Sequence, residues 1–111
     1  DPTVPSENYD FYALIFKRMG EIVIEMLDEA IDAFINRDLE TAKQVAKKDD
    51  VLDTIYADLK KRLRSGQEGL KLEETIDLML AAKHLERMGD YVTNICEYTT
   101  MLTTGVQADL N

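Results

Sequence analysis

Two pairs of acidic residues have a spacing that suits cation binding. Asp49 and Asp53 are four residues apart. Glu86 and Asp90 have the same spacing, and Asn94 follows one helical turn later. In a helix this spacing places each pair on one face, with the side chains about 6 Å apart. Carboxylate oxygens at that separation suit hard cations such as Mg²⁺, Mn²⁺ or iron, rather than a tetrahedral structural zinc. The five residues are therefore candidate metal ligands.

Spacing alone decides little in a chain with 22 acidic residues. Composition predicts roughly four acidic pairs four residues apart by chance, and the sequence contains six, at 21/25, 25/29, 28/32, 49/53, 73/77 and 86/90. Three of these lie between residues 21 and 32, where a solvated charged face explains them. The pairs 49/53 and 86/90 differ because they lie in mid-helix beside apolar residues, where burying a charged carboxylate lowers stability.

The two pairs are also predicted to lie at the same height in the fold. If the connection between two antiparallel helices is centred between Gln67 and Glu68, Asp49 precedes it by about as many residues as Glu86 follows it, roughly 19. Like charges about 5 Å apart repel by on the order of 3 kcal/mol at an effective dielectric near 20. Converging carboxylates must therefore bind a cation, become protonated or move apart. The alternative is ordinary ion pairing with nearby basic residues, namely Lys47, Lys48, Lys83 and Arg87.

Apolar residues recur at helical spacing in three long segments, which predict helices over about residues 9–36, 39–63 and 71–104. Asp38 is a suitable N-cap for the second of these helices, and Gly66 a suitable residue to follow its last turn. Short connections place consecutive helices antiparallel. The predicted fold is therefore all-α, an up-down-up antiparallel three-helix bundle.

The predicted domain covers residues 9–105, between a linker of residues 1–8, which holds both prolines, and a tail of residues 106–111. The third helix is expected to turn one apolar seam toward the core, at steps of three and four residues. That seam consists of Leu78, Ala81, Leu85, Met88, Val92, Ile95, Thr99 and Leu102.

Several other side chains have structural interpretations. The methionines at positions 19, 26, 79, 88 and 101 are expected to fill the core, and Cys96 to act there as a small apolar side chain. His84, the single histidine, is expected to be exposed, and the sequence has no Glu-x-x-His pair of the ferritin type. Gly89 in mid-helix lowers helix stability by about 1 kcal/mol. The missing side chain there would allow close helix approach, or access for a hydrated cation.

Charge excludes some partners. Among 111 residues, 13 are basic and 22 acidic, which gives a net charge of −9. Such a field repels nucleic acids and anionic lipid surfaces, so neither is an expected partner. The sequence shows no membrane span, targeting signal, Gly-rich phosphate loop or nucleophile elbow, and a cytoplasmic location is expected. The acidic face of the first helix, with Glu21, Glu25 and Asp28, is a candidate contact for a basic partner, and Arg87 is a further candidate contact.

Two segments resemble the motifs of the PhoU family. Residues 82–97 (AKHLERMGDYVTNICE) are similar to its signature, a Leu/Ile-Glu-Arg-Ile/Met-Gly/Ala-Asp core followed four residues later by Asn-Ile. Residues 49–56 (DDVLDTIY) resemble its other motif, Asp-x-x-x-Asp followed by an aromatic residue. The resemblance covers roughly residues 10–105. Family members typically hold two tandem three-helix repeats, and this chain is similar to one of them, more to the second than to the first.

The resemblance implies a non-catalytic, negative regulator of inorganic phosphate uptake and phosphate-starvation signalling. The implied partners are a high-affinity phosphate transporter and a sensor histidine kinase. Some family members bind iron, zinc, magnesium or manganese through these motifs, which implies that Asp49, Asp53, Glu86 and Asp90 are metal ligands and that Asn94 is a weaker candidate.

Two other functions remain open at this point. One is a cytosolic PhoU-like domain of a sodium–phosphate cotransporter, and the other is a metal-free helical scaffold or oligomerisation module. A single repeat lacks the companion bundle that full-length members of the family pack against, so exposed apolar surface and a homodimer are expected for this chain.

Overall fold

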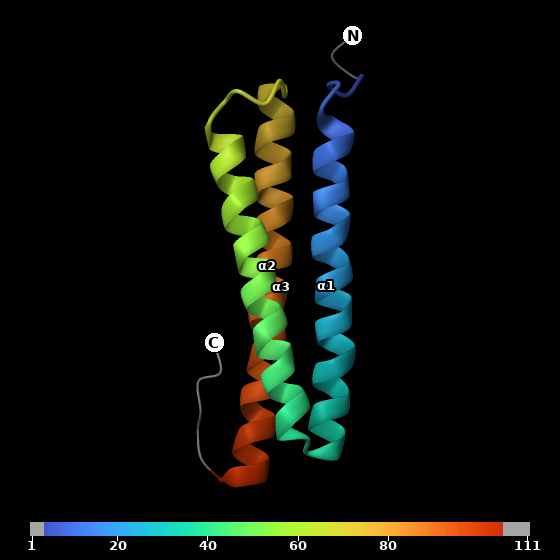
Figure 1. The fold of residues 1–111 in the computed structure, drawn as a ribbon, viewed down its shortest axis with the longest axis vertical. Coiled ribbons are helices and arrows are strands. Elements are labelled where there is room, and N and C mark those ends of the chain that lie inside the picture. Colours follow the sequence, from blue (N-terminus) through green and yellow to red (C-terminus); the bar gives the residue numbers. More distant parts are fainter. Residues whose placement is uncertain (1–3, 106–111) are drawn as a thin grey trace.

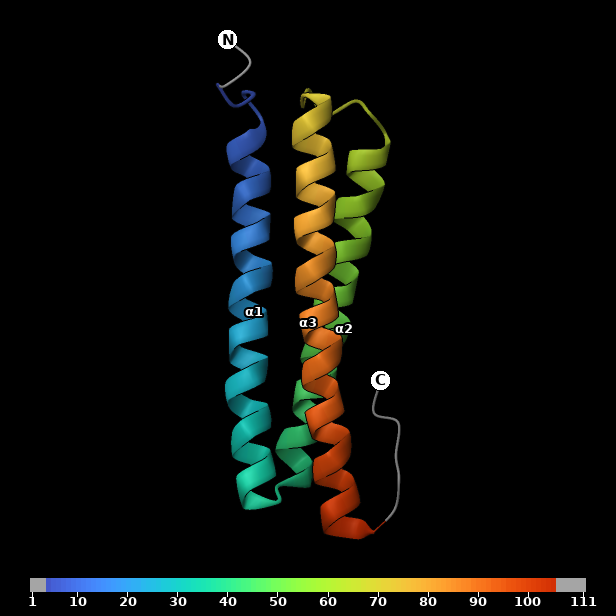
Figure 2. The same ribbon diagram turned by 180° about the vertical axis from the view of Figure 1, so that it is seen from behind.

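The computed structural model describes residues 4–105, which form three long helices (Figure 1). They are α1 (Tyr9–Asn36), α2 (Leu39–Arg64) and α3 (Leu72–Thr104). The chain descends in α1, ascends in α2 and descends again in α3, as both views show (Figures 1 and 2). Every pair of helices is in contact. The predicted all-α three-helix bundle is confirmed, and the expected tail lies outside the described residues.

Short connections with capping residues set this antiparallel order. Arg37 ends α1 in a left-handed conformation, with a φ of 52°. Asp38 then caps α2 as predicted, because its Oδ1 accepts a hydrogen bond from the Thr41 backbone N–H at 3.1 Å and its Oδ2 accepts one from the Thr41 hydroxyl at 2.7 Å. A side-chain cap of this kind stabilises a helix by typically about 1 kcal/mol. Gly66 follows the last turn of α2 with a φ of 68°, also as predicted.

The core face of α3 differs from the predicted seam. Leu78, Val92 and Thr99 are buried as expected, whereas Met88 is 49% exposed and Leu102 is 57% exposed. The other seam positions, Ala81, Leu85 and Ile95, are half-buried. In place of the missing seam residues, α3 buries four small ones: Ala82, Gly89, Thr93 and Cys96. The prediction was wrong at Met88 and Leu102, because periodicity marks a broad apolar side of the helix, and close packing against two other helices favours the smaller residues on that side.

The remaining core positions agree better with the sequence. Met19 and Met26 are fully buried, as expected of core methionines, and His84 is exposed, as expected. Cys96 is buried, and burial raises the pKa of its thiol to about 11, as do the nearby Glu97 and Glu29 charges. In the described part of the chain, no helix has a stretch long and apolar enough to cross a membrane.

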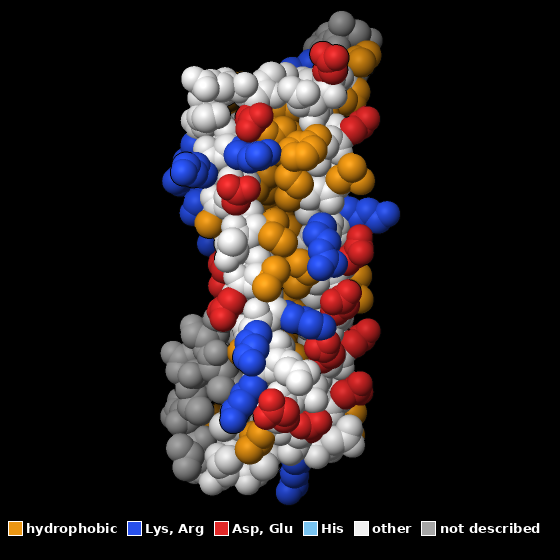
Figure 3. All heavy atoms as spheres, viewed as in Figure 1, with side chains coloured by type: hydrophobic (Ala, Val, Ile, Leu, Met, Phe, Trp, Pro, Cys, Tyr) orange, Lys and Arg blue, Asp and Glu red, His pale blue; other side chains and the backbone are white. Residues whose placement is uncertain are grey.

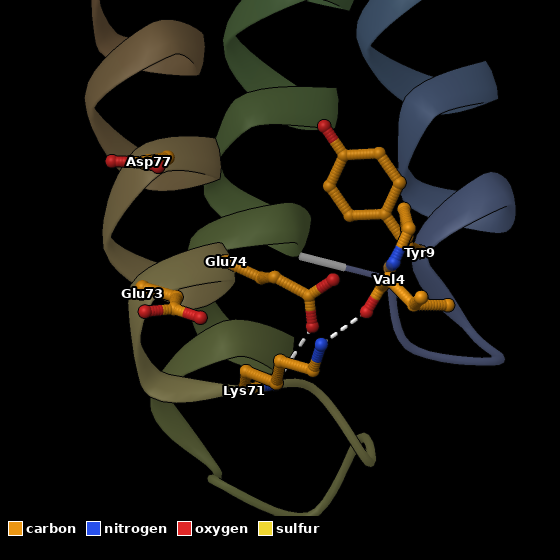
Figure 4. Close-up of a pocket in the computed structure, with 7 residues that line it drawn as sticks. Val4, Tyr9, Lys71, Glu73, Glu74 and Asp77 are labelled. Carbon is orange, nitrogen blue, oxygen red and sulfur yellow. Dashed lines mark hydrogen bonds between the residues drawn. The ribbon is translucent and has the colours of Figure 1, made fainter. Parts of the chain in front are cut away.

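Residues 4–8 lie against the end of the bundle where α2 connects to α3 (Figure 4). The Ser6 backbone N–H donates to Glu74 Oε2 at 2.8 Å, and the Ser6 hydroxyl donates to the same carboxylate. Lys71 Nζ donates a hydrogen bond to the backbone carbonyl of Val4. These contacts hold the segment before α1 beside the first turn of α3.

One apolar surface is the groove between α1 and α2. It forms a hollow of about 400 Å³ near the end of the bundle that also holds the α2–α3 connection. Hydrophobic side chains gather there in the upper part of the view (Figure 3). The hollow is lined by Phe11, Leu14, Ile15, Arg18, Ile55, Asp58 and Leu59.

A second apolar surface lies where α1 and α3 run side by side (Figure 2). Ala13 of α1 and Ala81 of α3 line one shallow hollow, so they mark the adjoining sides of the two helices. Residues seven positions apart share a side of a helix. The same two sides therefore continue through Leu27, Phe34, Met88 and Leu102, which are 40–57% exposed and which we call the α1–α3 face.

Candidate functional site

Three carboxylates meet where α2 packs against α3. Asp49 and Asp53 of α2 and Asp90 of α3 each offer one oxygen atom, and these atoms all lie within 4.8 Å of one another. We call these three residues the carboxylate cluster. Asp49 is fully buried, Asp53 is half-buried and Asp90 is exposed. The cluster therefore leads from the protein surface into the bundle core.

Gly89 makes room for the innermost of these carboxylates. A Cβ atom at position 89 would lie 2.6 Å from Asp49 Oδ1 and 2.5 Å from Leu52 Cδ2, closer than carbon and oxygen atoms pack. The absence of a side chain thus lets the Asp49 carboxylate rest directly against the α3 backbone. Close helix approach was one of the two roles expected of this glycine. A cradle shaped around an acidic side chain, with two more carboxylates beside it, fits an oxygen-coordinated cation.

Burial and mutual repulsion oppose ionisation of the cluster. The pKa of Asp49 is raised from 3.8 to about 7, first by burial and then by the charges of Asp53 and Asp90. Burial raises the pKa of Asp53 as well, and the Asp90 and Glu86 charges add to the effect. The pKa of Asp90 is raised by burial and by Glu86. A cation bound beside these carboxylates would lower all three pKa values.

Glu86 borders the cluster without being one of its three converging residues. Its side chain is 15% exposed, and its Oε2 accepts a hydrogen bond from Lys83 Nζ at 3.0 Å. Its charge contributes to the raised pKa values of Asp49, Asp53 and Asp90. The structure does not bring Asn94 into the cluster: it is exposed on α3, one turn beyond Asp90.

Ion pairs with nearby basic residues neutralise only some of the acidic side chains in and around the carboxylate cluster. Of the four basic residues that sequence suggested, Lys83 pairs with Glu86. Lys48 instead pairs with two acids of α1, Glu25 at 3.5 Å and Glu29. Within residues 4–105, neither Lys47 nor Arg87 forms an ion pair with an acidic side chain.

Tyr56, the aromatic residue that ends the motif over residues 49–56, makes contacts beside the cluster that were not predicted. Lys83 Nζ lies 5.5 Å from the centroid of the Tyr56 ring, and Lys60 Nζ lies 5.0 Å from the same centroid. Tyr56 follows Asp53 by three residues, so it occupies the same side of α2. In the sequence, Lys83 lies three residues before Glu86, which indicated an ion pair at the surface but not a contact with Tyr56.

The proposed partner-contact residues are all at the surface. Glu21, Glu25 and Asp28 are exposed on α1, and Arg87 is exposed on α3. Because Glu25 also pairs with Lys48, part of the acidic face is already neutralised within the chain.

A second group of acidic residues lines the hollow beside residues 4–8 (Figure 4). Glu74 there already accepts hydrogen bonds from Ser6 and from the backbone N–H of Lys71. Its neighbours Glu73 and Asp77 are exposed. This group therefore serves to attach the segment before α1, and the carboxylate cluster is the better candidate site.

Fold and site together define a class of protein: an all-α bundle whose second and third helices bring two acidic motifs into contact. The model of one family, the PhoU domain, matches residues 16–99. The chain belongs to the PhoU domain family.

Curated relatives have the same family name. The chain is 37% identical over 95 residues to a phosphate-specific transport system accessory protein PhoU homolog of Clostridium acetobutylicum, a match that covers 84% of this chain and 43% of the relative. Proteins of the same name match from Zymomonas mobilis, at 38% identity over 80% of this chain and 38% of the relative, and from Streptococcus pneumoniae, at 34% over 85% and 44%. The chain thus spans about 40% of the length of these relatives. No solved structure matches it.

In the presence of a chelator, the free energy of unfolding is expected to fall as the pH rises from about 4 to about 8. The folded pKa of Asp49, about 7, lies above its ordinary value of 3.8. Its contribution to stability is therefore complete below the ordinary value and is lost as the pH rises through the folded value. At about 1.4 kcal/mol per pKa unit, the loss is on the order of 2 to 4 kcal/mol. Urea unfolding near pH 5 and near pH 8, followed by circular dichroism, measures it.

Asp49→Asn should remove most of the pH dependence of the free energy of unfolding and should raise that free energy near pH 8. Asp50→Asn is the control for the change of charge, because Asp50 is the next residue, is exposed and contributes less to the raised pKa of Asp49 than burial, Asp53 or Asp90. If Asp49→Asn keeps the full pH dependence of the wild type, burial of the Asp49 carboxylate is not its cause.

Proposed function

We propose that this chain is a metal-binding, non-catalytic regulatory unit of inorganic phosphate uptake that acts in the cytoplasm as a negative regulator of phosphate-starvation signalling. Family membership and the names of its relatives, which are accessory proteins of phosphate-specific transport systems, support the link to phosphate. One observation carries the metal-binding part: a fully buried aspartate, Asp49, is cradled by Gly89 beside two other carboxylates.

In this proposal Asp49, Asp53 and Asp90 hold the cation, with Glu86 as a fourth ligand and Asn94 as a weaker candidate. A donor set made only of oxygen suits Mg²⁺, Mn²⁺ or ferric iron better than zinc. A bound cation would supply positive charge that relieves repulsion within the cluster. Since its ligands come from α2 and α3, the same cation would link the two helices.

The proposed partners are a phosphate transporter and a sensor histidine kinase. The net charge of −9 and the exposed acidic residues of α1, Glu21, Glu25 and Asp28, favour a basic contact surface on the partner. Arg87 is the proposed contact from α3, for an acidic group. The shared cation would make the rigidity of the α2–α3 pair depend on metal, and with it the surface offered to a partner.

Metal is expected to stabilise the wild-type protein. In thermal melts, millimolar Mn²⁺ or Mg²⁺ should raise the midpoint, because a ligand at a hundred times its Kd adds about 2.7 kcal/mol to the free energy of unfolding. Asp90→Asn should stabilise the protein by roughly 0.5 to 1 kcal/mol in chelator, where it removes screened repulsion, and should reduce the response to metal.

Asp50→Asn controls for net charge and should keep most of the metal response, because Asp50 is not one of the converging carboxylates although its charge acts on Asp49 and Asp53. A wild type that ignores all the cations tested, with an Asp90→Asn variant less stable than wild type in chelator, would contradict the metal site. That result would favour the metal-free scaffold instead.

A cellular experiment tests the regulatory role. In bacteria that lack their own PhoU homologue, expression of this chain should lower the initial rate of phosphate uptake and the activity of a phosphate-starvation reporter. Asp49→Asn should be less effective at equal protein level. If wild-type chain changes neither quantity, this segment alone does not regulate phosphate uptake.

We also propose that the isolated chain forms a homodimer through the α1–α3 face. This face exposes large apolar side chains that a second copy could bury, at about 25 cal/mol for each Å² removed from water. Sedimentation velocity should show a dimer at high micromolar concentration. The double substitution Leu27→Glu and Phe34→Glu should weaken dimerisation at least about tenfold. Leu14→Glu, at an exposed residue of the α1–α2 groove, is the control and should leave the dimer intact.

A further inference from the structure

Lys83 is a cation placed by the chain itself at the edge of the carboxylate cluster. Its Nζ donates to Glu86 Oε2 at 3.0 Å and lies 5.5 Å from the centroid of the Tyr56 ring. Glu86 belongs to α3 and Tyr56 to α2, so the ammonium group bridges the same two helices as the cluster. Its charge also opposes the burial that raises the pKa values of Asp53 and Asp90.

The two members of the ion pair differ in exposure. The Lys83 side chain is 51% exposed, whereas that of Glu86 is 15% exposed. A half-exposed lysine has four rotatable bonds and loses little when its ammonium group returns to water. Glu86, in contrast, is held near Asp90 by burial. Lys83 is therefore the member of the pair that can leave.

We propose that Lys83 is an internal competitor for the cation: it occupies Glu86 in the metal-free protein and so lowers the affinity of the cluster for metal. This inference rests on the proposed function. While Lys83 donates to Oε2 and neutralises its charge, Glu86 is a weaker ligand that offers a cation mainly its other oxygen. At a separation of about 6 Å, even the dielectric of water leaves a repulsion between an ammonium group and a divalent cation that weakens binding on the order of tenfold.

Lys60 provides a matched control for this role. Its Nζ lies 5.0 Å from the centroid of the same Tyr56 ring, so Lys60→Met and Lys83→Met remove the same charge and the same kind of cation–ring contact. In the described part of the chain, however, Lys60 forms no ion pair with an acidic side chain. A difference between the two variants therefore reports the position of the Lys83 charge beside Glu86 and the carboxylate cluster.

Titration calorimetry with Mn²⁺ tests the inference. Lys83→Met should bind Mn²⁺ about tenfold more tightly than wild type, and Lys60→Met should stay within about twofold of it. Urea unfolding in chelator gives a second, metal-free measurement: Lys83→Met should be less stable than Lys60→Met, and adding Glu86→Gln to Lys83→Met should restore stability.

The outcomes separate this inference from the proposed function. Equal Mn²⁺ affinity of Lys83→Met and Lys60→Met, or weaker binding by Lys83→Met, overturns the role of Lys83 while leaving the metal site intact. Failure of the wild type and both variants to bind Mn²⁺ contradicts the competition and the proposed metal site together. Equal stability of the two variants in chelator would show that Lys83 does not neutralise Glu86.

Discussion

The contact between the Asp49 carboxylate and the backbone of Gly89 is the constraint on which the arrangement of α2 and α3 depends. A Cβ atom at position 89 would clash with both Asp49 and Leu52, so α3 can approach α2 at this level only through a residue without a side chain. Ala82 and Cys96, seven residues to either side of Gly89, share its side of the helix and are fully buried. The small face of α3 that packs in the core is thus centred on the site.

This constraint also explains the apolar residues at the surface. Because α3 turns its small residues inward, Met88 and Leu102 are displaced sideways toward α1, where they are about half exposed. The α1–α3 face is therefore a consequence of how the cluster is built. Large exposed apolar patches on small domains mark contact surfaces, and the relatives of this chain are about twice its length. The carboxylate cluster and the exposed α1–α3 face are two results of the same helix packing.

Much of the fold could be predicted from the sequence because local signals determine it. Helical periodicity defined the three helices, and Asp38 and Gly66 marked the two ends of α2. Counting residues from the connection brought the two acidic pairs to similar heights, but the structure sets Asp49 beside Gly89 rather than level with Glu86. Which side of each helix faces the core was less predictable. The seam of α3 was wrong at Met88 and Leu102, because periodicity indicates a broad apolar side and cannot show which of two adjacent positions meets the other helices. The contact between Lys83 and the Tyr56 ring joins α3 to α2, and no spacing within one segment specifies it.

A graded burial of charge gives the cluster its chemical character. Asp49 is fully buried, Asp53 is half-buried and Asp90 is exposed, so the group that is hardest to ionise lies deepest and the one nearest to solvent lies outermost. Neutralising Asp53 or Asp90 would change the charge felt by the inner carboxylate, since both raise the pKa of Asp49. A change of charge near the surface therefore acts on Asp49 in the core, beside Gly89, which allows the close approach of α2 and α3. Burial of the Asp49 carboxylate lowers the stability of the fold, and it also makes ionisation of this core side chain depend on the charges of Asp53 and Asp90.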